Sequence, residues 1–117
     1  MKISKNTAEH YIWGRQCDGW HLVKREDLSV IHERMPANTK EVRHYHERAR
    51  QFFFVLRGVA TIEVDGEIIQ LNEQEGVEIP PHVPHQMMNL SGQEIEFLVI
   101  SKPTSKGDRV VVPDSKS

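Results

Sequence analysis

The chain has 117 residues, which is enough for one hydrophobic core but not for two independent ones. Hydrophobic residues make up 38%, charged residues 27%, and the net charge is −2, so the chain lacks the basic excess of a nucleic-acid-binding surface and we expect no such partner. The longest apolar run has five residues, far fewer than the ~20 of a membrane-spanning helix, and no apolar region suggests a signal peptide. We therefore expect a cytoplasmic protein without a membrane partner.

The N-terminal region contains both tryptophans and the only cysteine. Asn6 and Glu9 have the spacing of a capping box, which predicts one or two helical turns. Leaving Trp13 or Trp20 in water would forgo ~2 kcal/mol or more each, so we expect them to close one end of the core or to line a pocket. Because Cys17 is alone, no intrachain disulfide can form, and any metal must bind nitrogen and oxygen ligands.

From Leu28 to Ile100 the apolar residues follow the pattern of short β-strands, and no segment has a sustained helical period. Asp65-Gly66 is a strong hairpin signal, because both central positions of a type I′ turn need positive φ. Short strands separated by turns indicate an all-β fold, an antiparallel sandwich or barrel. The expected strands are 28–35, 41–46, 51–56, 59–64, 67–71, 77–79, 86–89 and 94–100.

These patterns divide the chain into three parts. We expect residues 1–27 to form an N-terminal segment that packs on a barrel, residues 28–102 to form the barrel, and residues 103–117 to form a C-terminal tail. In the tail, Arg109 to Val112 is apolar enough to add one edge strand, and the polar Pro113 to Ser117 is expected to be disordered.

Three histidines and one glutamine are candidate metal ligands. His44 and His46 lie two residues apart, which places both imidazoles on one face of a strand. Gln51 begins the next apolar strand, and His85 lies at the start of a later segment, directly before the expected strand 86–89. Three imidazoles, with the amide oxygen of Gln51 as a fourth candidate ligand, suit a divalent ion such as Fe, Mn, Ni, Cu, Co or Zn.

The order and spacing of these residues resemble the two motifs of the cupin superfamily, in particular its small single-domain members. The first motif reads Gly-x5-His-x-His-x3-4-Glu-x6-Gly, and its positions are held here by Asn38, His44, His46, Gln51 and Gly58. The second reads Gly-x5-Pro-x-Gly-x2-His-x3-Asn, and its positions are held by Gln74, Pro80, His82, His85 and Asn89. The similarity covers residues 35–100. It implies an antiparallel double-stranded β-helix, or jelly roll, with a divalent metal ion inside the barrel.

The sequence departs from these motifs at four positions. Gln51 replaces a glutamate ligand, and Asn38, Gln74 and His82 replace glycines. Asparagine tolerates the left-handed conformation, and near Gln74 the turn is expected from Gly76 instead. A histidine with positive φ at position 82 would be strained, so its side chain either serves at the pocket mouth or is an exposed loop residue without a role.

Gln51 influences which chemistry the site supports. An amide in place of a carboxylate removes one negative charge, which lowers the affinity for a divalent ion, disfavours Fe(III) and strengthens Lewis acidity. Glutamine also cannot accept a proton at neutral pH. Gln51 either binds the ion directly or bonds to a water molecule on it. The missing negative charge and the missing proton acceptor favour Lewis-acid chemistry or non-catalytic ligand binding over reactions with molecular oxygen.

Two hypotheses of different classes follow. One is a metal-dependent enzyme that acts on a small organic molecule, either as a dioxygenase or as a Lewis-acid isomerase, cyclase or lyase. The other is a non-catalytic module that binds a sugar, carboxylate or similar metabolite and uses the metal structurally. The small size and the lack of a second candidate acid or base favour the second hypothesis. The sequence identifies neither the substrate nor the catalytic residues.

Strand alternation also predicts an exposed apolar surface. If Gln51 and Phe53 face the barrel interior, then Phe52, Phe54 and Leu56 point outward. A second copy of the chain would cover these side chains, which predicts a homodimer. The alternative is coverage by the chain's own N-terminal segment.

Overall fold

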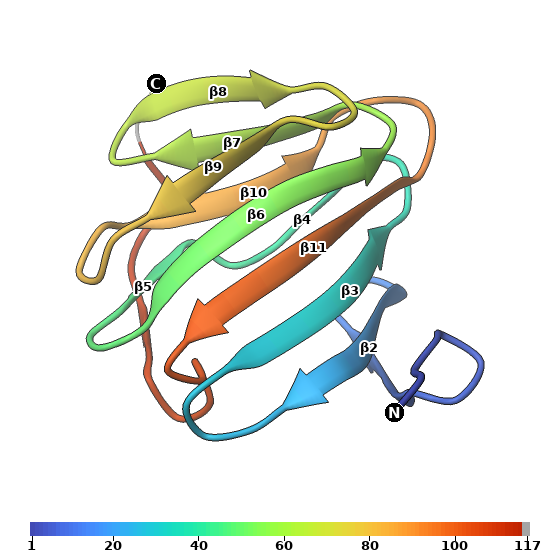
Figure 1. Cartoon of the computed structure of the whole chain (residues 1–117). Coiled ribbons are helices and arrows are strands. Elements are labelled where there is room, and N and C mark those ends of the chain that lie inside the picture. The colour runs from blue at the N-terminus through green and yellow to red at the C-terminus, as the bar shows by residue number, and fades with distance from the viewer. Residues whose placement is uncertain (116–117) are drawn as a thin grey trace.

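The computed structural model describes residues 1–115, which fold into two antiparallel sheets that face each other (Figure 1). The first sheet has the order β1-β2-β3-β11-β6-β9, and the second has the order β12-β5-β10-β7-β8, with β4 paired to β10. The strands are β1 (Glu9–Trp13), β2 (Cys17–Lys24), β3 (Ser29–Met35), β4 (Thr39–Lys40), β5 (His44–His46), β6 (Arg50–Arg57), β7 (Ala60–Val64), β8 (Glu67–Leu71), β9 (Gly76–Ile79), β10 (His85–Asn89), β11 (Ile95–Lys102) and β12 (Arg109–Val111).

The predicted all-β jelly roll is confirmed, and its β7–β8 hairpin forms as expected. Asp65 has a φ of 50° and Gly66 a φ of 92°, the positive values that a type I′ turn requires. Within residues 1–115 the structure contains no helix, and therefore none that is long and apolar enough to cross a membrane.

The predicted helical turns at Asn6–Glu9 are wrong. The amides of Thr7 and Ala8 both donate to the carbonyl oxygen of Ser4, which makes one isolated turn. Glu9 then begins β1, and its carboxylate accepts hydrogen bonds from Lys24 Nζ at 3.0 Å instead of capping a helix. Pairing of β1 with β2 therefore outweighs the local capping signal.

The expected strand 41–46 is shortened to β5 (His44–His46), and a separate short strand, β4 (Thr39–Lys40), precedes it. The Met87 amide on β10 donates to the carboxylate oxygen Oε2 of Glu41 at 2.8 Å. A side chain thus takes the place of a backbone acceptor, which interrupts the pairing with β10 between β4 and β5.

The core lies between the inner faces of the sheets. Phe53 and Val55 of β6 point inward, as predicted, together with Met35, Met87 and Phe97 from neighbouring strands. Alternation along β11 buries Phe97 and Val99 and leaves Leu98 and Ile100 partly exposed on the outer face. The first sheet is therefore apolar on both faces.

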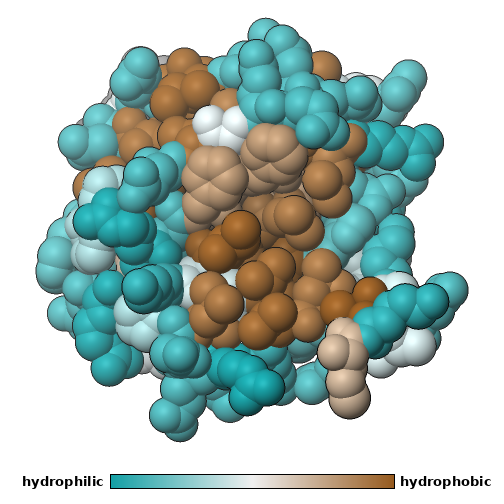
Figure 2. Space-filling view, in the orientation of Figure 1, coloured by the Kyte–Doolittle hydropathy of each residue, from teal (hydrophilic) through white to brown (hydrophobic). Residues whose placement is uncertain are grey.

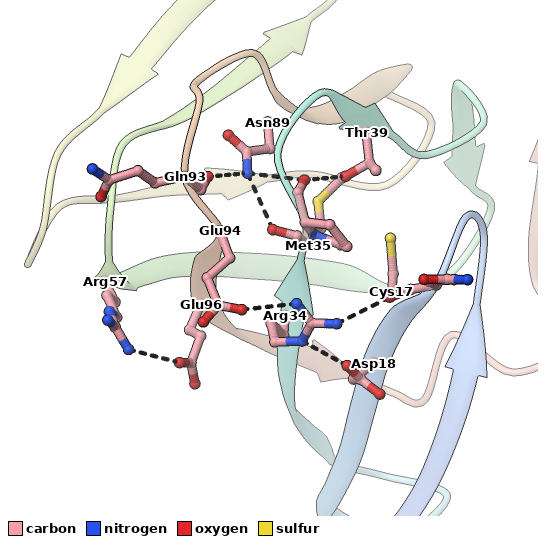
Figure 3. A network of polar contacts seen from close by, with 12 residues as sticks. Cys17, Asp18, Arg34, Met35, Thr39, Arg57, Asn89, Gln93, Glu94 and Glu96 are labelled. Carbon is pink, nitrogen blue, oxygen red and sulfur yellow. Dashed lines mark hydrogen bonds and ion pairs between the residues drawn. The ribbon is translucent and has the colours of Figure 1, made fainter.

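A polar network fixes one end of the barrel (Figure 3). The amide Nδ2 of Asn89, which is fully buried, donates to the carbonyl oxygens of Met35 at 3.1 Å and Gln93 at 2.7 Å. Nearby, the guanidinium of Arg34 on β3 donates to Asp18 on β2 and to Glu94. Since Asn89 and His85 are the two ends of β10, this network lies opposite the end that carries the histidines.

The first and last parts of the chain add strands to both sheets. β1 and β2 extend the first sheet through pairing of β2 with β3, and β12 pairs with β5 as the predicted edge strand. Asp114, in a stretch expected to be disordered, forms an ion pair with Lys40 at 3.3 Å. Residues 116–117 of that stretch lie outside the described residues. The division at residues 27 and 102 stays a prediction.

We expect the Asn89→Ala variant to lower the free energy of unfolding by roughly 3 kcal/mol, because it removes the hydrogen bonds that this fully buried amide donates to the carbonyl oxygens of Met35, Pro36 and Gln93. Urea unfolding followed by tryptophan fluorescence measures the change. Gln93→Ala is the matched control, because the network uses the backbone carbonyl of Gln93 while its side chain is exposed. Equal stability of Asn89→Ala and the wild type would contradict this role for the network.

Candidate metal centre

The three predicted histidines lie together inside the barrel. Antiparallel pairing of β5 with β10 places His44 opposite His85, and alternation along β5 turns His46 to the same side. The ligand nitrogens of the three rings all lie within 4.8 Å of one another. The rings are nearly inaccessible to solvent, with exposed fractions of 4%, 4% and 1% for His44, His46 and His85. The barrel therefore holds a buried cluster that is compatible with one metal ion.

Gln51 presents its oxygen to this cluster. Its Oε1 atom lies 3.2 Å from Nε2 of His85, while its Nε2 group donates to the hydroxyl of Ser101 at 2.9 Å. Ser101 lies directly across from Gln51 in the β6–β11 register. The serine hydroxyl thus orients the amide group of Gln51. Its Oε1 atom, which can serve as a metal ligand, faces the imidazole of His85.

The hydrogen bonds of His44 and His85 determine which nitrogen faces the cluster. Nδ1 of His44 lies 2.7 Å from the carbonyl oxygen of Val42, and Nδ1 of His85 lies 3.0 Å from that of Val83. A carbonyl oxygen only accepts, so both Nδ1 atoms carry the proton. Burial lowers the pKa of His44 to about 3 and that of His85 to about 4, which keeps both rings neutral at pH 7. Their Nε2 atoms therefore offer lone pairs.

These lone pairs require a positively charged or hydrogen-donating partner. Nε2 of His85 and Oε1 of Gln51 face each other as two acceptors at 3.2 Å, an arrangement that is repulsive unless a cation or a donor lies beside them. Neither nitrogen of the buried His46 ring has a hydrogen-bond partner among the described residues. A buried polar atom without a partner costs about 1–3 kcal/mol. A metal ion at the cluster would satisfy Nε2 of His85, Oε1 of Gln51 and one ring nitrogen of His46, so the residues fit the ion that the motifs imply.

Asp108 fixes the turn that connects His46 to Gln51. Its buried carboxylate accepts hydrogen bonds from the backbone amides of Glu47, Arg48 and Ala49, at 2.9 to 3.1 Å for the shortest bond to each. Burial alone would raise the pKa of Asp108, but the amide donors outweigh it and hold the pKa below its usual value. A charged carboxylate thus positions the turn between two candidate ligands, a role that the sequence did not reveal.

A cavity of about 290 Å³ opens beside the histidines. Its walls include His44, His46 and Gln51, with the aromatic side chains of Tyr11, Trp13 and Phe53 and the ionisable side chains of Glu33, Glu41 and Arg109. It shares Ile31 and Ser105 with a wider surface depression lined by Lys24, Arg25, Arg48 and Lys106, among others. A space of this size suits a small organic molecule.

Two carboxyl groups in this cavity correct the expectation that the site lacks a second candidate acid or base. Burial raises the pKa of Glu33 to about 7 and that of Glu41 to about 8. Strand parity alone points to Glu33, because it shares a face with Met35, a core residue. The position of Glu41 follows from the break between β4 and β5, which the sequence pattern does not predict.

The three residues that replace cupin glycines all adopt positive φ, with values of 60° at Asn38, 67° at Gln74 and 68° at His82. Gly76 does not supply the turn near Gln74. It lies in β9, where a Cβ atom would come within 2.5 Å of the carbonyl oxygen of Phe53. His82 is exposed and lies outside the walls of the 290 Å³ cavity, and its backbone amide donates to the carbonyl oxygen of His46.

Comparison with known proteins agrees with this architecture. A family model described as "Cupin domain" matches residues 31–101. The curated protein "Oxidoreductase macE" of Penicillium terrestre is 28% identical over 81% of this chain and 38% of its own length. Aligned regions cover between 36% and 66% of the curated relatives that the chain matches.

Two solved structures are similar over most of the chain. The polyketide cyclase RemF from Streptomyces resistomycificus has a TM-score of 0.84 at 17% identity, covering 99% of this chain and 87% of that one. KdgF from Halomonas sp. has a TM-score of 0.80 at 17% identity, covering 89% of this chain and 95% of that one. At such low identity these similarities establish the fold alone.

Proposed function

The chain belongs to the cupin family, and we propose that it is a metal-dependent enzyme that uses Lewis-acid chemistry on a small carbonyl compound bound in the barrel. The observation that carries this proposal is the convergence of acceptor atoms without donors. Nε2 of His44, Nε2 of His85, the unpartnered ring of His46 and Oε1 of Gln51 all belong to one buried cluster. In this proposal His44, His46, His85 and Gln51 hold the ion.

The donor set favours Lewis-acid chemistry over redox chemistry. All four proposed ligands are neutral, so none of them compensates the additional positive charge of a higher oxidation state. A divalent ion bound there would withdraw electrons from a substrate carbonyl and make the neighbouring C–H bond more acidic. The residues of the cavity would bind and orient the substrate, and a carboxyl group of the cavity wall would accept and return a proton.

The cavity wall supports a substrate with both an apolar body and oxygen groups. Tyr11, Trp13 and Phe53 offer aromatic surface, while Glu41 and Arg109 offer polar contacts. The name of the structurally similar polyketide cyclase denotes ring closure of an oxygen-rich organic molecule. We propose an enolisable ketone as the class of substrate.

Two alternatives remain distinguishable by experiment. A non-catalytic module for a sugar or carboxylate would bind its ligand without transforming it, and an oxidoreductase, as the Penicillium relative is named, would consume oxygen or another oxidant.

The identity of the ion is open among Fe, Mn, Ni, Cu, Co and Zn. Cytoplasmic localisation and the absence of nucleic-acid and membrane partners stay predictions from the sequence.

We expect protein purified without added ions to contain about one metal ion per chain, and the double variant His44→Ala/His85→Ala to lose it, since two of the proposed ligands are removed. The metal-loaded wild type should catalyse exchange of the C–H protons next to the carbonyl of hydroxyacetone or phenacyl alcohol with deuterium from D₂O. Elemental analysis measures the first result and proton NMR the second. The double variant should show neither.

The matched control is His82→Asn, which changes an exposed histidine and keeps a residue that tolerates positive φ. This control should keep both metal and exchange. Metal retained by the double variant would overturn the ligand assignment. Ligand binding without exchange would support the binding module, and oxygen consumption would support the oxidoreductase.

We also propose that the protein forms a homodimer through the outer face of the first sheet. Figure 2 shows a continuous hydrophobic area over the middle of the face that β3, β11 and β6 form in Figure 1. Phe52 is 37% exposed, and its ring stacks on that of Phe54 with the ring centroids 6.0 Å apart. Trp13 lines the cavity, whereas Trp20 and Lys5 cover only the part of this outer face beside His32 and leave Phe52 exposed. A second copy of the chain is therefore the cover that we propose.

Light scattering should return twice the chain mass of 13.6 kDa for the wild type. Phe54→Lys should return the monomer mass, because it places a charge within the apolar interface. Ile68→Lys is the matched control, since Ile68 is 64% exposed on β8 of the other sheet. A monomeric wild type would contradict the proposed dimer.

A further inference from the structure

Three residues form a row across the first three strands of the first sheet. Tyr11 on β1 pairs with Gly19 on β2, and Gly19 pairs with Glu33 on β3. The hydroxyl of Tyr11 donates to Oε2 of Glu33 at 3.1 Å, so the tyrosine side chain spans the whole width of β2.

Gly19 makes this span possible. A Cβ atom at position 19 would lie 2.2 Å from Cζ of Tyr11, well inside the distance at which carbon atoms collide. The tyrosine ring therefore crosses β2 directly over the one residue that has no side chain. Glycine inside a strand often marks such a close approach.

Tyr11 and Glu33 both line the cavity that contains His44 and His46. Among the described residues, the close cluster of potential ligands consists of the three histidines and does not include Glu33. The carboxyl group of Glu33 thus faces the space for a bound molecule rather than the position of the ion. Tyr11 contacts one of its two oxygens, Oε2, and the other oxygen is left for that molecule.

The surroundings keep Glu33 near the point where it exchanges a proton at neutral pH. Burial raises its pKa to about 7, while the hydrogen bond from Tyr11 lowers it. Burial also raises the pKa of Tyr11, which keeps its hydroxyl protonated as a donor. The other titratable or charged groups that face this region are Cys17 on β2, Glu41 before β5 and Arg109 on β12.

Glu41 is less suited to proton transfer than Glu33. Its carboxylate is bound by the amide of Met87, and its own amide donates to the carbonyl oxygen of Met87. Glu41 is therefore fixed to β10 as part of the framework that carries His85. Glu33 has no backbone donor on its carboxylate among the described residues.

We propose that Glu33 is the general base of the barrel site and that Tyr11, held over Gly19, is the residue that positions it. This inference rests on the proposed function. In the step, the C–H bond next to the substrate carbonyl breaks and its proton passes to Oε1 of Glu33. The electron pair of that bond moves into the carbonyl group, which gives the enolate of the substrate. Return of a proton from Glu33, after exchange with solvent, re-forms the C–H bond.

The test compares Glu33→Gln with the wild type in the exchange of hydroxyacetone and phenacyl alcohol protons in D₂O. We expect the exchange rate to fall about 100-fold or more, since general acid–base catalysis contributes 10²–10⁴-fold. The metal content should stay at the wild-type value. Glu67→Gln is the matched control, because Glu67 is exposed on β8 and lies outside the cavity wall. Its exchange rate should equal that of the wild type.

Tyr11→Phe tests the positioning role without relying on Glu33→Gln to fold. Loss of the hydroxyl donor destabilises the charged carboxylate, so the pKa of Glu33 should rise. Carbon-13 NMR titration of the Glu33 carboxyl group measures this in the metal-free protein. In the loaded enzyme, the exchange rate should increase with pH as Glu33 loses its proton, and Tyr11→Phe should move the midpoint of that increase upward.

The outcomes separate this inference from the function on which it rests. Absence of exchange in the metal-loaded wild type would overturn both. Exchange in the wild type that persists in Glu33→Gln would overturn the role of Glu33 alone, as would loss of exchange in Glu41→Gln but not in Glu33→Gln. An unchanged titration of Glu33 in Tyr11→Phe would overturn the positioning role of Tyr11.

Discussion

The histidine cluster depends on two hydrogen bonds of the same kind. His44 and His85 each place Nδ1 against the carbonyl oxygen two residues earlier, in Val42 and Val83. Because burial keeps both rings neutral, these bonds fix the tautomer and direct both Nε2 lone pairs away from the backbone. Pairing of β5 with β10 then makes the two lone pairs converge. The chemistry that the protein can perform depends on what occupies the point where they meet.

Residues that do not belong to the cluster hold it in place. Ser101 orients the amide of Gln51, and Asp108 fixes the turn between His46 and Gln51 through three backbone amides. On the opposite side of the cavity, Tyr11 bonds to Glu33 over Gly19. In the proposed mechanism, a metal ion on the neutral ligand set would polarise a carbonyl group, and the separate carboxyl group of Glu33 would accept a proton.

Alternation and motif spacing predicted the parts of the structure that depend on neighbours in sequence. The outward direction of Phe52 and Phe54 and the hairpin at Asp65-Gly66 follow from strand period and turn residues, whereas the joining of His85 with His44 and His46 was predicted from the resemblance to the two cupin motifs. The prediction of helical turns at Asn6–Glu9 was wrong, because the strand pairing of Glu9 outweighs a local capping signal. A local sequence signal therefore predicts the structure only where it is compatible with the strand pairing of the whole sheet.

The contacts that complete the cavity join distant strands and leave no local signal. Tyr11 and Glu33 are separated by β2, and their hydrogen bond depends on the absence of a side chain at Gly19. Asp108 lies about sixty residues from the turn that it fixes. Only the order of strands in the first sheet and the pairing of β12 with β5 bring these groups together.

The most direct measurement of the central claim is nitrogen-15 NMR of the histidine rings, before and after addition of one equivalent of zinc. In the metal-free protein at pH 7, we expect His44 and His85 to be neutral with the proton on Nδ1. Zinc should then shift the Nε2 signals of both rings, together with a nitrogen signal of His46. Protonated rings, a proton on Nε2, or spectra that zinc leaves unchanged would contradict the claim that these lone pairs form a metal centre.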